Sequence, residues 1–512
     1  MAIELSSLTF TEQDDIVPAS GVEEIVNTGI ANTLAGDDIL NGDTGNIDNT
    51  PIPLRPSGIN NTSTLNTNGG NDILTGISKN LSYDWAESYG IYNQGNIDTS
   101  DGDDIIIGIN QKNVSYYSAG IYNWGTIDTS DGDDIITGIN EKGEPGYFAG
   151  IYNGYTTGIL NTGNGKDIIT GTNISSPNGR GIDNSYNSVI NTGDDNDTII
   201  GNGYGEGIFN LFSTLNTGNG NDIIIGNSSN IGIYTVGQID TGDGNDTISG
   251  ASPGYGIFST SDIYTGEGDD IITSTSVIDN GGSIYTGNGE DSIISQGNFI
   301  NESLVFLEDG NDSLIADAGF SDIAIQNSDY IETGEGNDII TSTGVIYNAG
   351  IIETGNGDDS IIVNITVAGY GISNHNGTIN MGDGNDSIIF NSTAGYGISN
   401  YNGTINMGDG NDSIIASEGF SNLNFYDYSG SVFLGEGDDY INSFGSDEFS
   451  GGNGNDTLEL TPGTYTVGRW YTAVTFTKGS SIMITSEFEK LIAGSTTYDF
   501  TSLTKGQTIT VA

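Results

Sequence analysis

Apolar residues recur along this chain at fixed distances from an acidic, glycine-rich segment, G-x-G-x-D. Two residues after the last aspartate of each segment there is always Ile or Leu, as at Leu74 and Ile248. Seven residues before it there is an aliphatic or aromatic residue in every copy except the first, which has Ala31. The residues beside the apolar one vary among Ile, Thr, Ser and Tyr, and this period-two alternation is typical of β-strands. Each copy is therefore predicted to fold as a strand, a tight glycine turn and a second strand.

The last aspartate of each copy, here called the anchor aspartate, defines the repeat. The 17 copies run from Asp38 to Asp456, so the mean period is about 26 residues, which is within the range of solenoids. In such folds each rung buries its apolar face only against its neighbours. The anchor aspartates are Asp38, Asp72, Asp104, Asp134, Asp167, Asp197, Asp222, Asp246, Asp270, Asp291, Asp312, Asp338, Asp359, Asp386, Asp412, Asp439 and Asp456.

A second motif, G-I-x-N, lies between the glycine turns. It occurs, for example, as Gly90-Ile91-Tyr92-Asn93 and again as Gly371-Ile372-Ser373-Asn374. We interpret it as a third strand of each rung. Its asparagines either stack as an amide ladder along the solenoid axis or form a polar turn, and the sequence leaves both open.

These elements predict an all-β protein, a right-handed parallel β-solenoid of about 17 rungs that spans residues 36–456. Residues 1–35 are expected to cap its N-terminal end. Residues 457–512 are expected to form a C-terminal β cap, because an uncovered solenoid edge aggregates. The alternation in residues 464–467 and 474–476 predicts antiparallel strands within that cap.

Charge narrows the choice of partners. The chain has 69 acidic and 10 basic residues, and the whole net charge of −59 lies before the last 56 residues, which are neutral overall. Such a field repels nucleic acid and anionic membranes and attracts cations. High charge also accompanies disorder, but here the apolar residues recur in register.

The residue types exclude several chemistries. The chain has no cysteine and a single histidine, His375, so disulfides and cysteine–histidine zinc sites are excluded. No apolar run approaches the length of a membrane span. Residues 1–20 have neither a basic nor an apolar region of a Sec-type signal peptide, so export would need another signal.

Oxygen atoms remain as the metal ligands, and the turns are rich in them. Calcium prefers six to eight oxygens from carboxylates and backbone carbonyls, and a glycine turn can present both at close approach. We therefore predict several Ca²⁺ ions held by the anchor aspartates and by further acidic residues of the same turns. These further candidate ligands are Asp101, Asp103, Asp131, Asp133, Asp243, Glu267, Asp269, Asp358, Asp383, Asp409 and Asp438.

These repeats resemble the hemolysin-type calcium-binding repeats of the repeats-in-toxin family, whose consensus is G-G-x-G-x-D followed by an apolar residue two places on. The copy at residues 451–458 is the most similar. The resemblance implies a calcium-filled parallel β-roll, type I secretion through an uncleaved C-terminal signal within residues 457–512, and an extracellular or cell-surface location.

The chain departs from the family pattern in two ways. The first glycine is mostly threonine, as at Thr99, and each rung has one acidic turn, so calcium is expected along one edge only. Three turns are expected to be weaker, because they contain Lys166, Asp195 in place of a glycine, or Glu308 in place of a glycine.

The expected function is calcium binding by a secreted or cell-surface repeat protein that folds on binding calcium and has a structural or interaction role, not an enzymatic one. An extracellular carbohydrate or cell-surface partner stays open. One alternative is a polysaccharide lyase or epimerase on a β-helix. It is disfavoured because residues 371–389 and 397–415 are identical except that His375 matches Tyr401. The other is an adhesin or ice-binding face made by the threonines that precede the turns.

Overall fold

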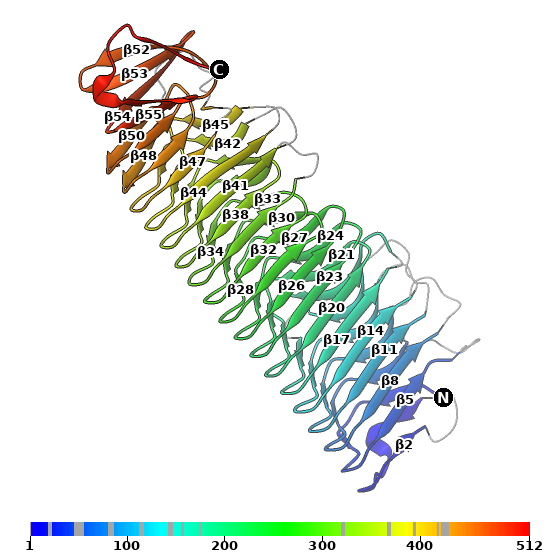
Figure 1. The fold of residues 1–512 in the computed structure, drawn as a ribbon. Helices are drawn as coiled ribbons and strands as arrows, with labels where there is room; N and C mark the ends of the chain where they lie inside the picture. The colour runs from blue at the N-terminus through cyan, green and yellow to red at the C-terminus, as the bar shows by residue number, and fades with distance from the viewer. Residues whose placement is uncertain are drawn as a thin grey trace. The chain divides into compact units, whose positions relative to one another are not determined.

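The computed structural model describes residues 2–18, 23–45, 56–79, 87–111, 117–141, 147–154, 158–174, 176–318, 323–365, 370–392, 396–416, 419–420 and 430–512. The chain divides into two compact units, Met1–Val277 and Ile278–Ala512. Within each unit the strands of successive rungs lie side by side in parallel sheets, so each unit is a parallel β-solenoid (Figure 1). The described segments contain no helix that is both long and apolar enough to cross a membrane.

Each regular rung has three strands, one in each of three sheets. The chain passes through sheet A, which contains the G-I-x-N motif, then sheet C, then the glycine turn, and then sheet B. In unit 1, sheet A consists of β1 (Ile3–Glu4), β3 (Ile25–Asn27), β6 (Ser57–Asn61), β9 (Ser88–Asn93), β12 (Tyr117–Asn123), β15 (Tyr147–Asn153), β18 (Gly179–Ser185), β21 (Glu206–Leu211), β24 (Ile231–Thr235) and β27 (Tyr255–Ser259).

The two sheets that flank the glycine turns of unit 1 follow the same order. Sheet C consists of β4 (Ala31–Asn32), β7 (Thr64–Asn66), β10 (Asn96–Asp98), β13 (Thr126–Asp128), β16 (Ile159–Asn161), β19 (Val189–Asn191), β22 (Thr214–Asn216), β25 (Gln238–Asp240) and β28 (Ile263–Tyr264). Sheet B consists of β2 (Ile16–Val17), β5 (Ile39–Asp43), β8 (Ile73–Ser78), β11 (Ile105–Asn110), β14 (Ile135–Asn140), β17 (Ile168–Asn173), β20 (Thr198–Gly203), β23 (Ile223–Asn227), β26 (Thr247–Ala251) and β29 (Ile271–Ser274). A short 3-10 helix, η1 (Leu5–Ser7), lies in the first, irregular turn.

Unit 2 repeats this arrangement. Its sheet A consists of β30 (Val277–Asn280), β33 (Phe299–Asn301), β36 (Ile323–Asn327), β39 (Val345–Asn348), β42 (Tyr370–His375) and β45 (Tyr396–Tyr401). Its sheet C has β31 (Ser283–Tyr285), β34 (Leu304–Phe306), β37 (Tyr330–Glu332), β40 (Ile351–Glu353), β43 (Thr378–Asn380), β46 (Thr404–Asn406), β48 (Ser431–Glu436) and β50 (Glu448–Asn453). Its sheet B has β32 (Ser292–Ser295), β35 (Ser313–Ala316), β38 (Ile339–Ser342), β41 (Ser360–Ile365), β44 (Ser387–Ser392), β47 (Ser413–Ile415), β49 (Tyr440–Asn442) and β51 (Thr457–Glu459).

The C-terminal residues continue the solenoid before they close it. Strands β54 (Ser481–Ser486) and β55 (Lys490–Ala493) pair in parallel with β50 and β51 and so add one more rung. The closing strands pair in antiparallel fashion: β52 (Gly463–Trp470) pairs with β53 (Ala473–Lys478) and with β57 (Thr508–Val511), β53 pairs with β54, and β55 pairs with β56 (Thr496–Asp499). The 3-10 helix η2 (Phe500–Ser502) lies between β56 and β57. The antiparallel pairing predicted from the alternation in this segment is confirmed.

The core consists of the aliphatic columns that the repeat predicts. Ile97, seven residues before its anchor aspartate, and Ile106, two residues after it, are both fully buried, as is Ile91 of the G-I-x-N motif. Each column is in register from rung to rung, as in the pairing of Leu65 with Ile97. A buried isoleucine side chain contributes about 2 to 3 kcal/mol, so stacking of rungs provides the apolar stabilisation that one rung cannot.

The asparagines of G-I-x-N form the amide ladder, not a turn. Asn61 Nδ2 donates to Asn93 Oδ1 at 2.8 Å and to the carbonyl oxygen of Asn96 at 2.9 Å. The side chains of Asn61, Asn93 and Asn123 are fully buried. The ladder runs in unit 1 through Asn27, Asn61, Asn93, Asn123, Asn153, Asn184 and Asn210, and in unit 2 through Asn280, Asn301, Asn327, Asn348, Asn374 and Asn400. Because each amide meets the next rung in only one register, the ladder fixes the stacking.

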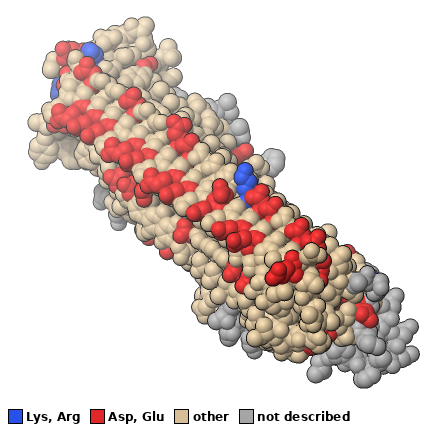
Figure 2. All heavy atoms as spheres, turned by 90° about the horizontal axis from the view of Figure 1, so that it is seen from below, with Lys and Arg blue, Asp and Glu red and all other residues tan. Residues whose placement is uncertain are grey.

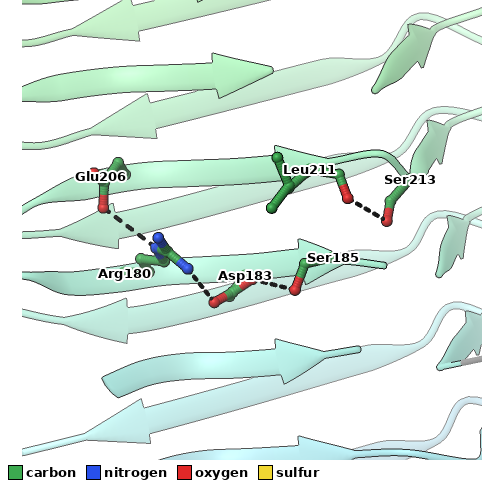
Figure 3. A network of polar contacts seen from close by, with 6 residues as sticks. All are labelled: Arg180, Asp183, Ser185, Glu206, Leu211 and Ser213. Carbon is green, nitrogen blue, oxygen red and sulfur yellow. Dashed lines mark hydrogen bonds and ion pairs between the residues drawn. The ribbon is translucent and has the colours of Figure 1, made fainter. Parts of the chain in front are cut away.

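The opposite face of sheet A in unit 1 carries stacked aromatic rings, with one polar interruption. Tyr122 stacks on Tyr152 at a centroid distance of 4.7 Å, and the next register position is Asp183. Arg180 occupies this gap: its guanidinium donates to Asp183 at 2.6 Å and to Glu206 at 3.4 Å (Figure 3). The same guanidinium lies 3.4 Å from the ring centroid of Phe209, where the aromatic column resumes. The buried Asp183 carboxylate and the mostly buried Glu206 carboxylate are thereby paired, and the column stays packed.

Candidate metal centre

The glycine turns share a positive φ at the residue four positions before the anchor aspartate. Gly163 has a φ of 82° there, and Ser100 and Glu308 adopt positive values as well, at 60° and 70°. Two positions before the anchor, Gly70 has a φ of 139°, and a Cβ there would lie 2.2 Å from the carbonyl oxygen of Gly36 in the previous turn. Successive turns therefore stack with their backbone carbonyls in close contact, which only glycine allows without strain.

The two substitutions expected to weaken a turn still adopt a positive φ. Asp195 has a φ of 84°, compared with 137° at Gly165 and 153° at Gly220 in the equivalent positions of the adjacent rungs, and Glu308 has the value given above. A side chain in this left-handed region costs on the order of 1 kcal/mol or more, so these turns are strained but formed.

Every anchor aspartate points into the solenoid. The side chains from Asp38 to Asp456 in this series are all at most 1% exposed. They lie two residues before the buried Ile or Leu, so the alternation of the strand places them on the same inner face. The anchor aspartates therefore form a buried column of carboxyl groups beside the turns in each unit.

One carboxyl oxygen of each anchor is satisfied by the neighbouring rung. Oδ1 of Asp104 accepts the backbone N–H of Asp72 at 2.7 Å, and Oδ1 of Asp134 accepts that of Asp104 at 2.8 Å. The same bond recurs from Asp38 to Asp270 in unit 1 and from Asp291 to Asp456 in unit 2.

The other carboxyl oxygen lacks a donor in most rungs. Oδ2 is buried and accepts no hydrogen bond of ordinary geometry in Asp38, Asp104, Asp134, Asp167, Asp197, Asp222, Asp246, Asp312, Asp338, Asp359, Asp386, Asp412, Asp439 and Asp456. Where a threonine lies five residues before the anchor, as Thr33 does before Asp38, it interacts with the carboxyl group and lowers its pKa, while its Oγ1 also donates to the carbonyl oxygen of Thr67 at 3.0 Å. No threonine occupies that position before Asp312, Asp386, Asp412, Asp439 and Asp456. In Asp72 the corresponding Thr67 hydroxyl does donate to Oδ2. A buried carboxylate oxygen without a donor requires a proton or a cation.

Burial shifts the acidity of this column strongly. Burial raises the pKa of Asp104 and Asp197 from 3.8 to about 8, and that of Asp134 to about 7, against the lowering effect of hydrogen bonds from the neighbouring threonines and backbone. In unit 2 burial likewise raises the pKa of Asp312 to about 8, and nearby anchor carboxylates raise it further. At neutral pH the anchors with the highest pKa values, such as Asp104 and Asp312, therefore hold a proton unless a cation replaces it.

The remaining predicted ligands lie on the other side of the turn, facing solvent. Asp101 and Asp103 are exposed, as are Asp131, Asp133, Asp243, Glu267, Asp269, Asp358, Asp383, Asp409 and Asp438. They occur one or three residues before the anchor and form outward columns, and Asp and Glu side chains gather in rows on the face drawn in Figure 2. The structure therefore separates the predicted set into a buried ladder and exposed columns.

Two residues that the motif missed extend the ladder. The backbone N–H of Asp15 donates to Asp38 Oδ1 at 2.7 Å, and Glu489 Oε2 accepts the backbone N–H of Asp456 at 2.9 Å. Neither residue follows a glycine turn. The available signal is the buried apolar residue two positions later, which is Val17 after Asp15 and Leu491 after Glu489.

A calcium ion fits this donor set only if the backbone contributes most of its ligands. Within the described segments, no three Asp, Glu, His or Cys side chains converge on one point. Each turn nevertheless combines a buried anchor carboxylate with glycine carbonyls that stack closely on the next turn, and carboxylate and carbonyl oxygens are both ligand types that Ca²⁺ takes. The residues present therefore match Ca²⁺ in ligand type.

The two alternative functions depend on the threonines before the turns, for an ice-binding face, and on His375, for an enzyme. The threonines before the turns, such as Thr99 and Thr129, are fully buried and form no surface array. His375 is exposed and stacks on Tyr401 of the next rung at a centroid distance of 4.8 Å. It occupies one position in a surface column.

Comparison with known proteins gives little further information. No family model matches the chain, and no curated protein matches it. Among solved structures, the chain is similar to a hyperactive, Ca²⁺-dependent, β-helical antifreeze protein from an Antarctic bacterium, with 18% identity over 82% of this chain and 85% of that chain and a TM-score of 0.32. At that TM-score the likeness carries no argument about function.

Proposed function

We propose that this chain is a calcium-binding repeat protein of the repeats-in-toxin type, in which Ca²⁺ ions bind along the inner side of the glycine turns and complete the fold. The observation that supports this most directly is the column of buried anchor carboxylates whose Oδ2 atoms accept no hydrogen bond of ordinary geometry. A single such group would be a local irregularity. Its recurrence in rung after rung supports a cation bound at the turn.

The anchor aspartates and the glycine carbonyls of adjacent turns would hold the ion. When bound, Ca²⁺ supplies the positive charge that lets the whole column ionise without burying unpaired negative charge. The chain contributes the rest: the stacked turns orient the carbonyls, and the aliphatic columns exclude water from the inner face. Magnesium fits poorly, because it demands a smaller, octahedral shell and retains its water.

A pair of matched variants tests which side of the turn binds the ion. Asp246→Asn removes a charge from the buried ladder, whereas Asp243→Asn removes the same charge from the exposed side of the same turn. Calcium bound per chain is measured by equilibrium dialysis, with far-UV circular dichroism as the check that both variants stay folded in excess calcium. We expect Asp246→Asn to lose one or two ions and Asp243→Asn to lose none. Equal losses, or a loss only in Asp243→Asn, would refute the assignment.

The cellular setting follows from the same proposal. A chain whose fold depends on millimolar calcium stays unfolded in a cytosol and folds outside the cell, where calcium is plentiful. We therefore propose an extracellular or cell-surface structural role, with type I export directed by residues 457–512. The threonines that precede the turns are buried, so these residues cannot form the ice-binding face of the alternative.

A further inference from the structure

A hollow of about 250 Å³ lies in unit 2, between the outer face of sheet C and the tip of the β52–β53 hairpin. Its floor comes from three neighbouring parallel strands in register: Ser431 pairs with Glu448, and Phe433 pairs with Ser450. β54 adds the third strand of that floor. Its wall is formed by Trp470 and Tyr471 at the end of the hairpin.

Three aromatic rings around this hollow are exposed to solvent. Trp470 is 52% exposed, Tyr471 is 93% exposed and Phe433 is 46% exposed. The Trp470 and Tyr471 ring centroids are 6.2 Å apart and the rings are tilted by 42°, so the two rings are not stacked face to face. Single exposed aromatics are ordinary, but several around one concave site are typical of ligand-binding sites.

The polar groups of the hollow set the chemistry of the ligand. Glu448 is exposed at its edge, and the hydroxyl groups of Ser431 and Ser450 line the floor. Ser450 Oγ donates to Glu487 Oε2, which leaves its oxygen available as an acceptor. The described residues that line the hollow include no Lys, Arg or His. Such a site accepts hydrogen bonds and disfavours anions, so it suits a ligand with many hydroxyl donors and no negative charge.

We propose that this hollow binds a neutral pyranose sugar, as a monosaccharide unit of an extracellular glycan. A pyranose ring has an apolar face of C–H groups, which packs on Trp470 and Tyr471, and a rim of hydroxyl groups, which reach Glu448 and the serines. The volume suits one ring. The site is separate from the glycine turns and does not depend on where calcium binds.

The proposal is tested with the full chain in excess calcium, with Trp85→Phe and Trp124→Phe introduced so that Trp470 is the only tryptophan. Its fluorescence is followed while methyl β-D-glucopyranoside, methyl α-D-mannopyranoside and methyl β-D-galactopyranoside are added in turn. We expect at least one glycoside to change the emission with a dissociation constant on the order of 1 mM. Glucuronate, which has the same ring with a carboxylate, should bind at least tenfold more weakly because Glu448 repels it.

Calorimetry of the otherwise unaltered chain and its Trp470→Ala and Tyr471→Ala variants provides the second readout, with circular dichroism to show that each is folded. Removal of either ring should weaken binding of the responding glycoside by about tenfold. The proposal is overturned if none of the three glycosides binds, if Trp470→Ala binds as well as the parent, or if glucuronate binds best. It is also overturned if Trp470→Ala changes only the sedimentation of the chain, which would make the hollow a contact between copies.

Discussion

Removal of calcium at alkaline pH should unfold this chain, and mild acid should restore the fold without calcium. The perturbation acts on the buried anchor carboxyls, because burial raises the pKa of Asp134 and Asp167 from 3.8 to about 7. Each tenfold change in the affinity of a carboxylate for its proton corresponds to about 1.4 kcal/mol. Keeping one of these carboxylates ionised in the folded state therefore costs up to about 4 kcal/mol.

The total free-energy cost of ionising the buried carboxyls is large because the same group recurs in many rungs. Twelve anchor aspartates have a pKa raised to between about 6 and about 8: Asp72, Asp104, Asp134, Asp167, Asp197, Asp222, Asp246, Asp312, Asp359, Asp386, Asp412 and Asp439. Even about a third of that cost in each would exceed the usual net stability of roughly 5–15 kcal/mol. We therefore expect the calcium-free chain to be largely disordered at pH 8 and low salt.

The sign of the pH dependence follows from the direction in which burial moves these pKa values. The folded-state pKa values lie above the unfolded value, so protonation favours the fold: the stabilisation is complete below about pH 4 and is lost as the pH rises through about 6 to 8. At pH 5 these twelve anchors are mostly protonated, whereas carboxylates in water, which have pKa values near 4, are mostly ionised. This pH also stays above the pI of about 4.1, where the chain would precipitate.

The assay is far-UV circular dichroism of the chelator-treated chain at low salt, at pH 8 and at pH 5, followed by calcium titration at pH 8. We expect a β signal at pH 5 without calcium, and at pH 8 only with calcium at about 10⁻⁴–10⁻³ M. Magnesium should substitute poorly. A full β signal in excess chelator at pH 8 would mean that the aliphatic columns hold the solenoid without ions, and equal stability at both pH values would remove the role of the anchor carboxyls.

Three further predictions concern single elements. His375→Tyr should leave thermal stability and any activity unchanged, because Tyr401 occupies the equivalent place in the next rung; loss of function in this variant would revive the enzyme alternative. Deletion of residues 457–512 should cause aggregation, because it uncovers the edge of β50 with which β54 pairs, and it should block export if the signal lies in this segment. Normal secretion of the shortened chain would contradict the export signal, and a soluble monomer would contradict the role of the segment as a cap. Asn123→Ala should lower the free energy of unfolding in urea by about 3 kcal/mol, because the side chain bridges Asn93 and Asn153 and its buried partners would lose their hydrogen bonds; a change below about 1 kcal/mol would mean that the ladder adds little.

The strands, the glycine turns and the columns of buried aliphatic residues could be predicted from the amino-acid sequence alone. These features are local: alternation assigns Ile97 and Ile106 to the inner face without knowledge of any partner. The same alternation carried a further signal, since each anchor aspartate lies two residues before a core Ile or Leu and so shares its face, whereas Asp101 and Asp103 lie at the opposite parity. The buried ladder and the exposed columns could have been separated on that basis.

The hydrogen-bond partners of those side chains depend on the stacking of the rungs. The acceptor for the N–H of Asp72 is Asp104, and the partner of Asn93 is Asn123, each about a full repeat away, so their bonds exist only after rungs have stacked in register. The unpaired Oδ2 atoms, the raised pKa values and the pairing of Arg180 with Glu206 arise in the same way. The hollow at Trp470 combines β48, β50 and β54 with a hairpin tip. Side-chain alternation is a property of one strand, whereas burial of charge and the shape of a cavity depend on which strands come together.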